Sequence, residues 1–238
     1  MSRFRAVVVC YHAASAAWDQ RMSIAPATIE RQVRLLLRRG FRPATAAVAA
    51  AGTSRVVHVT FDDAYRSIED ALPPLERLGV PVTIFACSAY ADEGAPLTVP
   101  ELADEDRSEL ATMAWPKLRE LAGRGVEIGS HTVSHPHLTQ LSDEELRREL
   151  VDSKVRVEDE LGRPCRYLAY PYGDEDVRVR RAAGAAGYEA AFALPGSRAA
   201  PEPLRVPRVG FYHRDSLLRA TLKSSDLVRR PLERLVGY

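Results

Sequence analysis

Two adjacent carboxylates, Asp62 and Asp63, directly follow the hydrophobic run 56–61. That run, VVHVTF, is typical of a buried β-strand. Neighbouring negative charges repel, so both acids cost free energy unless a cation or hydrogen-bond donors meet them. One Asp is explained as the N-cap of a following helix, but the second is not. The role of the second carboxylate therefore stays open at this point.

Two histidines four residues apart, His131 and His135, lie in the segment GSHTVSHPHL after another predicted strand. Pro136 disfavours helical geometry at His135, so we expect a loop or a single turn there. An isolated pair at this spacing is more often two unrelated loop histidines. Beside an Asp pair, however, two imidazoles and one carboxylate make a three-ligand zinc site with a fourth position for water. One Asp would then bind the metal, and the other would stay free as a base.

These residues are carried by strands and helices that alternate along the chain. The patterns predict strands at 6–11, 56–61, 80–87, 126–129, 167–170, 188–193 and 204–209. They predict helices at 28–39, 44–51, 65–78 with an interruption at Pro73-Pro74, 115–122, 142–161 and 176–186, with a polar helix near the C-terminus. Residues 89–112 are interpreted as an insertion loop.

Strand–helix alternation indicates an α/β protein built from parallel β/α units, either a barrel or a doubly wound open sheet. Sites in both folds form at the C-terminal ends of the strands. Asp62-Asp63, His131 and the segment AYPYGD at 169–174 all follow predicted strands, and Tyr11-His12 follows the first. We expect these four loops to converge.

Composition narrows the class of protein. The 238 residues are 46% hydrophobic and 27% charged, which allows a full core in one large domain or two small ones. A formal net charge of +1 gives no overall electrostatic attraction for nucleic acid, and we expect no nucleic-acid partner.

Residues 205–238 hold eight Lys/Arg against three acids. We therefore divide the chain into a domain at 1–212 and a basic helical tail at 213–238.

The three cysteines, Cys10, Cys87 and Cys165, are far apart, and the first two lie in apolar runs. They are interpreted as reduced core residues. The N-terminal apolar run is too short for a signal peptide, and no run is long enough to span a membrane. We expect a cytoplasmic protein, with a peripheral place at the inner membrane face left open. The oligomeric state is not predicted.

The motifs TFDDAY, GSHTVSHPHL, AYPYGD and VVVCYH resemble those of the polysaccharide deacetylase family, also called the NodB-homology domain or carbohydrate esterase family 4. The resemblance runs from about residue 7 to 209. It implies a distorted barrel of seven or eight β/α units. It also implies metal-dependent hydrolysis of an N-acetyl group, in some members an O-acetyl group, on a sugar.

The resemblance also implies roles for individual residues. Asp62 matches the general base of the family. Asp63, His131 and His135 match its metal ligands, with Zn²⁺ expected and Co²⁺ or Ni²⁺ as alternatives. Tyr172, in the PYG motif, matches the residue whose backbone N–H helps to hold the oxyanion.

Two departures from the family pattern stand out. Most members have an arginine that orients the base, and Ala169 occupies that position here. Arg208, in LRVPRVGF, is our candidate for the same role. The general-acid histidine usually lies near the C-terminus, but His213 fits that motif poorly, and a branch of the family places the acid in an N-terminal "YH". We therefore expect His12 to be the general acid, against the alternative of a strand-end histidine bound to a carbonyl.

The substrate stays open. A cytoplasmic sugar precursor, a lipid-linked glycan and a small glycoside all fit, as does a non-sugar N-acyl or cyclic amide cleaved on the same scaffold. A catalytically silent carbohydrate-binding protein is a further alternative, although both aspartates and both histidines are present. Trp115, Tyr90 and Tyr65 are candidates for lining a sugar cleft, but aromatic residues at such spacings are more often core. His58 and His137 are interpreted as structural.

Overall fold

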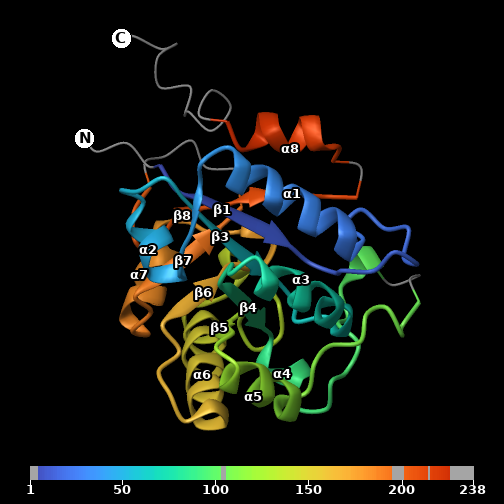
Figure 1. Cartoon of the computed structure of the whole chain (residues 1–238). Coiled ribbons are helices and arrows are strands. Elements are labelled where there is room, and N and C mark those ends of the chain that lie inside the picture. Colours follow the sequence, from blue (N-terminus) through green and yellow to red (C-terminus); the bar gives the residue numbers. More distant parts are fainter. Residues whose placement is uncertain (1–4, 103–105, 195–200, 214, 226–238) are drawn as a thin grey trace.

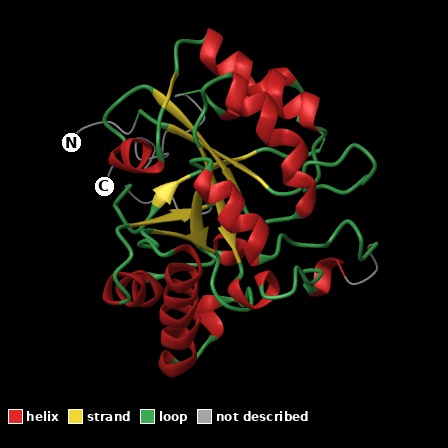
Figure 2. Ribbon diagram, turned by 60° about the horizontal axis from the view of Figure 1, so that its bottom comes forward, coloured by secondary structure: helices red, strands yellow, loops and turns green. Residues whose placement is uncertain are grey.

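The strands form one parallel sheet that curls nearly into a barrel, with the helices around its outside (Figures 1 and 2). The computed structural model describes residues 5–102, 106–194, 201–213 and 215–225. The sheet order is β8-β7-β6-β5-β4-β3-β1-β9, with β2 paired to β3, and every pairing is parallel. The predicted α/β barrel is confirmed. Its strands are β1 Val7–Tyr11, β2 Arg42–Pro43, β3 Val56–Phe61, β4 Val82–Ala86, β5 Glu127–Ser130, β6 Tyr167–Ala169, β7 Ala190–Ala193, β8 Val206–Pro207 and β9 Val209–Gly210.

The helices cover the outer side of this sheet (Figure 2). They are α1 Pro26–Arg38, α2 Ala46–Ala51, α3 Leu72–Arg77, α4 Ser88–Ala91, α5 Trp115–Gly123, α6 Asp143–Leu161, α7 Val177–Ala185 and α8 Leu217–Lys223. Short 3₁₀ turns are η1 Arg66–Ala71, η2 Pro100–Leu102, η3 Leu138–Gln140 and η4 Pro171–Gly173. Because side chains in the barrel interior and helices outside bury both faces, every residue of β1, β3 and β4 is buried.

The sheet closes through one short segment, residues 206–210. β8 pairs with β7 at one edge of the sheet, and β9 pairs with β1 at the other. Arg208 lies between these two strands, and its backbone N–H donates to the Ala193 carbonyl at 2.9 Å. The single strand predicted at 204–209 is therefore divided, because each half pairs with a different neighbour. This closure places the Arg208 side chain in the barrel interior.

Two other local predictions need correction, and one short strand was missed. The helix predicted at 65–78 is a 3₁₀ turn followed by α3, and Pro73 and Pro74 form the first turn of α3, where a missing N–H costs no hydrogen bond. The insertion loop predicted at 89–112 overlaps α4 and contains η2, and several of its apolar side chains are buried in the core. Strand β2 has no apolar alternation and was not predicted.

The outermost helix on one side is α8, which lies beside α1 (Figure 1). The Arg39 guanidinium after α1 donates to the Thr221 carbonyl at 3.0 Å and to Ser224 Oγ at 2.7 Å. Among the described residues, no helix has the length and apolar character needed to cross a membrane. The division of the chain at residue 212 stays a prediction, and residues 214 and 226–238 of the proposed tail lie outside the described ranges.

Candidate functional site

The predicted site residues meet at one rim of the barrel. His12 follows β1, Asp62 and Asp63 follow β3, and the loop with His131 and His135 follows β5. Tyr172 follows β6, and Arg208 lies at the closure of the sheet. Because all strands are parallel, their C-terminal ends share this rim, and the expected convergence of four loops is observed.

The loops that carry the site contain several residues with left-handed backbone conformation. Within the described ranges, the non-glycine residues with positive φ are Asp63, Ala64, Thr132, His135 and Tyr172, and all of them lie in the site loops. Such conformations are costly for residues with a Cβ and persist where the surroundings fix them. The turn at Asp63 (φ 67°) separates the directions of the two neighbouring carboxylates.

Asp62 is bound by Arg208. The guanidinium donates to Oδ1 of Asp62 at 2.6 Å and to Oδ2 at 2.7 Å, which is a bidentate pair. Burial alone raises the pKa of Asp62, but the Arg208 charge and hydrogen bonds hold that pKa well below its usual range. The Cys10 thiol, whose own pKa is raised by burial, also donates to Oδ2 at 3.4 Å. Asp62 is therefore a fixed, ionised carboxylate.

Asp63 turns toward the two histidines instead. Its Oδ1 lies 3.4 Å from Nε2 of His131 and 3.4 Å from Nε2 of His135. One ligand atom from each of the three residues lies within 4.8 Å of the others, and all three are largely buried. Burial lowers the pKa of His131 and of His135 to about 4, so both imidazoles are neutral at pH 7.

The donor set fits a divalent cation. The His131 Nδ1–H donates to the Ala169 carbonyl at 2.7 Å, which leaves Nε2 as an acceptor directed at a carboxylate oxygen. Asp63 Oδ1 is buried without a hydrogen-bond partner, and burial raises the pKa of Asp63. Acceptors that face one another in a buried place are unfavourable unless a cation lies between them. Two imidazoles and one carboxylate are a common catalytic zinc set.

Ala169 stands where the resemblance implies an arginine, and here its backbone contacts the site. The Ala169 carbonyl orients the His131 ring, and its side chain is buried. The guanidinium that meets Asp62 comes instead from Arg208, on the strand segment that closes the barrel.

Glu149, on α6, fixes the loop between the two histidines. Its carboxylate accepts from the N–H of Val133 at 2.7 Å, the N–H of Ser134 at 3.0 Å and the Ser134 hydroxyl at 2.6 Å. A second contact from α6 joins Ser153 to Ser130 at 2.9 Å. Sequence reasoning missed Glu149. The sequence feature that could have revealed it is an acidic residue one helical turn from Leu146 and from Ser153, which both lie on the buried side of α6.

His12 lies close to Asp62. A ring nitrogen of His12 and a carboxylate oxygen of Asp62 are within 4.8 Å of each other. The side chain is buried, and Nδ1 has no hydrogen-bond partner. The alternative of a histidine satisfied by a backbone carbonyl therefore lacks a partner at that nitrogen. His213 lies elsewhere, with Nε2 at 3.3 Å from Asp19 and Nδ1 at 3.2 Å from the Ser23 carbonyl.

Tyr172 forms a wall of the site beside His135. Its ring meets the His135 ring edge-on at a centroid distance of 4.5 Å and stacks on His137 at 4.0 Å with an interplanar angle of 14°. His137 in turn lies 3.7 Å from Asp174. His137 thus supports the wall of the site. His58 lies inside β3, with its ring nitrogens 2.9 Å from the Ala44 carbonyl and 2.9 Å from Thr83 Oγ1.

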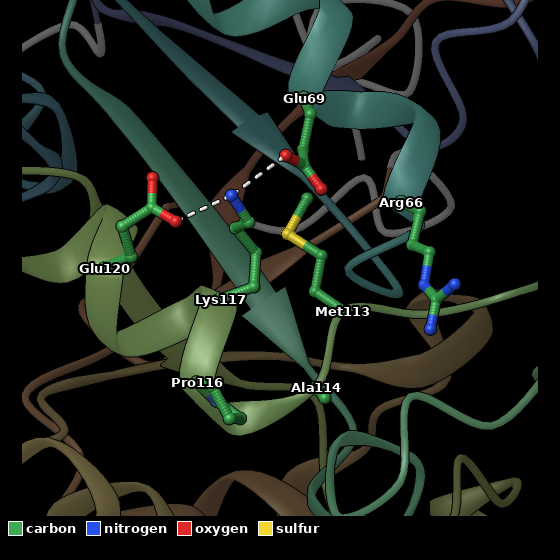
Figure 3. A pocket seen from close by; sticks show the side chains of 7 residues that line it. All are labelled: Arg66, Glu69, Met113, Ala114, Pro116, Lys117 and Glu120. Carbon is green, nitrogen blue, oxygen red and sulfur yellow. Dashed lines mark hydrogen bonds and ion pairs between the residues drawn. The ribbon is translucent and has the colours of Figure 1, made fainter.

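The aromatic candidates for a sugar cleft are largely core residues. Trp115 is buried and donates from Nε1 to Asp92 at 2.7 Å, and Tyr65 is buried against Trp18. Tyr90 is partly buried against the same core. A separate hollow lies between η1 and the start of α5, where Lys117 pairs with Glu69 at 3.2 Å and Glu120 at 2.6 Å (Figure 3). It contains none of the predicted site residues.

Comparison with known proteins decides the family. The family model for polysaccharide deacetylase matches residues 49–191, more than half of the chain. The chain belongs to the polysaccharide deacetylase family. The matched range includes Asp62, Asp63, His131, His135 and Tyr172, and it leaves out His12 and Arg208. For those two residues, only the geometry described above bears on a role.

Similar proteins agree with this family. YxkH of Bacillus subtilis (strain 168), assigned to the polysaccharide deacetylases, is 27% identical over 138 residues, which are 58% of this chain and 44% of YxkH. The polysaccharide deacetylase BC0361 of Bacillus cereus has a TM-score of 0.75 and 21% identity, over 92% of this chain and 69% of its own. The deacetylase PplD of Streptococcus pyogenes, solved with acetate, has a TM-score of 0.75 and 18% identity, over 92% and 97%. At these identities the two structures show the shared fold.

Proposed function

We propose that this protein is a divalent-metal-dependent hydrolase that removes an N-acetyl group from a sugar or glycan. Asp63, His131 and His135 would hold the ion, with zinc as the first candidate and cobalt or nickel as alternatives. The observation that supports this most is the separation of the two acids. Arg208 occupies both oxygens of Asp62, while Asp63 Oδ1 lies 3.4 Å from two imidazole nitrogens.

A divalent ion bound at these three residues supplies Lewis-acid chemistry, which lowers the pKa of water and polarises an acetyl carbonyl. Asp62 would accept the proton of the attacking water. It is suited to this role because Arg208 keeps it ionised and fixed in direction, and because it does not belong to the ligand set. The water oxygen forms the new bond to the carbonyl carbon of the acetyl group.

The carbonyl oxygen gains negative charge as that bond forms. The backbone N–H of Tyr172 would donate to it, and loss of one such donor typically costs about 10²–10³ in rate. Pro171, one residue earlier, fixes its own φ and helps to set this turn. Only the backbone of Tyr172 would be needed for this role, while its ring packs against His135.

The bond between the carbonyl carbon and nitrogen then breaks, and the departing nitrogen needs a proton. His12 would donate it, a contribution of roughly 10²–10⁴ in rate. Its support is the buried position beside Asp62 and the unpartnered Nδ1. Acetate and a free amine are the products.

The test is acetate release from a panel of N-acetylated sugars, O-acetylated sugars and non-sugar N-acyl amides. Each is measured after metal reconstitution, with and without chelator, and with Asp62→Asn as the matched inactive variant. We expect chelator-sensitive release from an N-acetylated sugar. Release from amides alone would assign the same site to a different amide substrate. Metal binding without any release would indicate a carbohydrate-binding protein.

A further inference from the structure

Helix α8 exposes three leucines to solvent. Leu217, Leu218 and Leu222 have exposed fractions of 44%, 69% and 51%. Seven large apolar side chains are exposed among the described residues, and one helix of seven residues holds three of them. We call these three side chains the α8 leucine face. Single exposed leucines are ordinary, but a cluster on one short helix indicates a contact surface.

The leucine face does not serve the fold of the described protein. α8 is attached through Ala220 and Ser224, which are buried, and Arg39 donates to Ser224 and to the Thr221 carbonyl. Gln32 of α1 also donates to the Asp215 carbonyl just before α8, at 3.1 Å. These contacts hold α8 beside α1 (Figure 1), while its three leucines stay exposed.

The exposed side of α1, the helix that contacts α8, is basic. On α1, Arg31, Arg34 and Arg38 are exposed at the spacing i, i+3 and i+7, which places them in one stripe. The only acid in α1 is Glu30, which pairs with Arg34 at 2.7 Å. α8 has no acid and carries the exposed Arg219. Residues 226–238 continue the same composition, with three arginines against two acids.

The position of α8 relates this surface to the site. Only residues 211–216 separate β9 from α8, so the helix begins at the rim where the site residues meet. Tyr212, in that connection, lies 6.5 Å from the His12 ring, centroid to centroid, at an interplanar angle of 26°. Leu217 and Leu218 are in the first turn of α8, next to this connection.

We propose that the α8 leucine face, with the arginines of α1, docks on an anionic lipid surface. Leucines on a short amphipathic helix enter the boundary between headgroups and acyl chains, and nearby arginines are attracted to anionic headgroups. A second copy of the chain is a poorer occupant, because two basic faces would repel each other. The segment 226–238 is also net basic, which disfavours it as a cover. Docking would bring the rim of the barrel close to the lipid headgroups.

The test is co-sedimentation of the full-length protein with vesicles. One set contains equal amounts of phosphatidylglycerol and phosphatidylcholine, and the other contains phosphatidylcholine alone. We expect binding to the anionic set that weakens as salt rises. L218S/L222S should weaken binding by at least about tenfold, while the matched control V155S/V177S, with valines exposed on α6 and α7, should bind as wild type does.

A second pair of variants tests the contribution of the arginine charges to vesicle binding. R31Q/R38Q should lose about fivefold in affinity per arginine, while R147Q/R148Q on the exposed side of α6 should lose clearly less. None of these residues belongs to the proposed catalytic or metal site. Hydrolysis of a water-soluble substrate should therefore be unchanged in all four variants, which keeps this test separate from that of the proposed function.

Four results would overturn the proposal. The first is no binding to anionic vesicles, and the second is equal binding by L218S/L222S and wild type. The third is a dimer, seen by light scattering, that L218S/L222S converts to a monomer without any vesicle binding, which would assign the face to a second copy. The fourth is binding abolished by R229Q/R230Q/R234Q but untouched by L218S/L222S, which would assign it to residues 226–238 alone.

Discussion

The Arg208 guanidinium binds both oxygens of the Asp62 carboxylate, at 2.6 and 2.7 Å, in the buried interior of the barrel. The two neighbouring aspartates therefore have different partners. Arg208 occupies Asp62 and keeps it ionised, so that only Asp63 is available to the two histidines. The pair also joins the closing segment of the sheet to the end of β3, so the same contact connects the fold to the proposed chemistry.

Removing the arginine should damage both stability and turnover. Arg208→Ala leaves a buried carboxylate without its partner, which typically costs about 3–5 kcal/mol in free energy of unfolding. Arg208→Lys keeps the charge but not the bidentate geometry, and we expect it to fold and to lose most of its turnover. Urea unfolding and acetate release measure the two effects. Full activity in Arg208→Lys would show that the geometry of Asp62 does not depend on this pair.

The double variant D62N/R208M separates the two effects of this pair. A neutral amide and an apolar side chain of similar length replace the ion pair, and such replacements are often neutral for stability. We expect the double variant to regain much of the stability lost in Arg208→Ala while remaining inactive. If it were as unstable as Arg208→Ala, the loss would come from packing around the guanidinium and not from the unpaired charge.

Neighbouring aspartates should respond differently to the same isosteric change. Asp63→Asn replaces an anionic ligand by a neutral one, and we expect metal affinity to fall by about 10²-fold or more. Asp62→Asn should bind metal as wild type does and lose turnover. Competition with a fluorescent chelator measures affinity, and acetate release measures turnover. Equal metal affinities in the two variants would contradict the assignment of Asp63 as the ligand.

Most of this site is visible in the sequence because its residues follow strands. Asp62, Asp63 and His131 come just after predicted strands, and parallel topology brings such positions together. The divided closing strand at 206–210 is less visible, because its two halves are too short for periodicity to separate them. Pro73 and Pro74 suggested an interrupted helix, whereas they begin a new one. Glu149 was missed because its partners are backbone N–H groups of a distant loop, which no side-chain pattern shows.

Glu149 should be a positioning residue for the histidine loop. Its carboxylate accepts hydrogen bonds from two backbone N–H groups in the segment between Thr132 and His135. Thr132 and His135 themselves have left-handed backbone conformations. Glu149→Ala should weaken metal binding by about 10–100-fold, the usual effect of losing a group that orients a ligand. Glu149→Gln should retain part of the affinity, because its amide oxygen still accepts. Glu144→Ala, at an exposed position on the same helix, is the control.

A structural role alone would lower stability without altering the site. The visible absorption of the Co²⁺-substituted protein distinguishes the two possibilities, because it reports ligand geometry. We expect the spectrum of Glu149→Ala to change in shape and that of Glu144→Ala to match wild type. An unchanged spectrum and unchanged metal affinity in Glu149→Ala, with only a loss of stability, would restrict Glu149 to the fold.

His58 should make the fold sensitive to acid. Burial lowers the pKa of His58 to about 4 from an ordinary value of 6.5. Because the folded-state pKa is the lower one, the unfolded chain takes up the proton first as pH falls. The stability contributed by neutral His58 is therefore complete above pH 6.5 and is lost progressively toward pH 4. Between pH 7 and pH 5 this single group should remove about 2 kcal/mol of unfolding free energy.

The measurement is urea unfolding of metal-free protein at pH 7 and pH 5. His58→Asn removes the titrating ring and should lose about 2 kcal/mol less than wild type over this interval, whatever its stability at pH 7. Thr83→Val removes the hydroxyl that lies 2.9 Å from His58 Nε2 but keeps the ring, so it should lose as much as wild type or more. If wild type and His58→Asn lost the same free energy, His58 would not titrate below its ordinary pKa in the folded protein. The acid sensitivity would then have to come from the other buried groups, His131 and His135 foremost, whose pKa values burial also lowers to about 4.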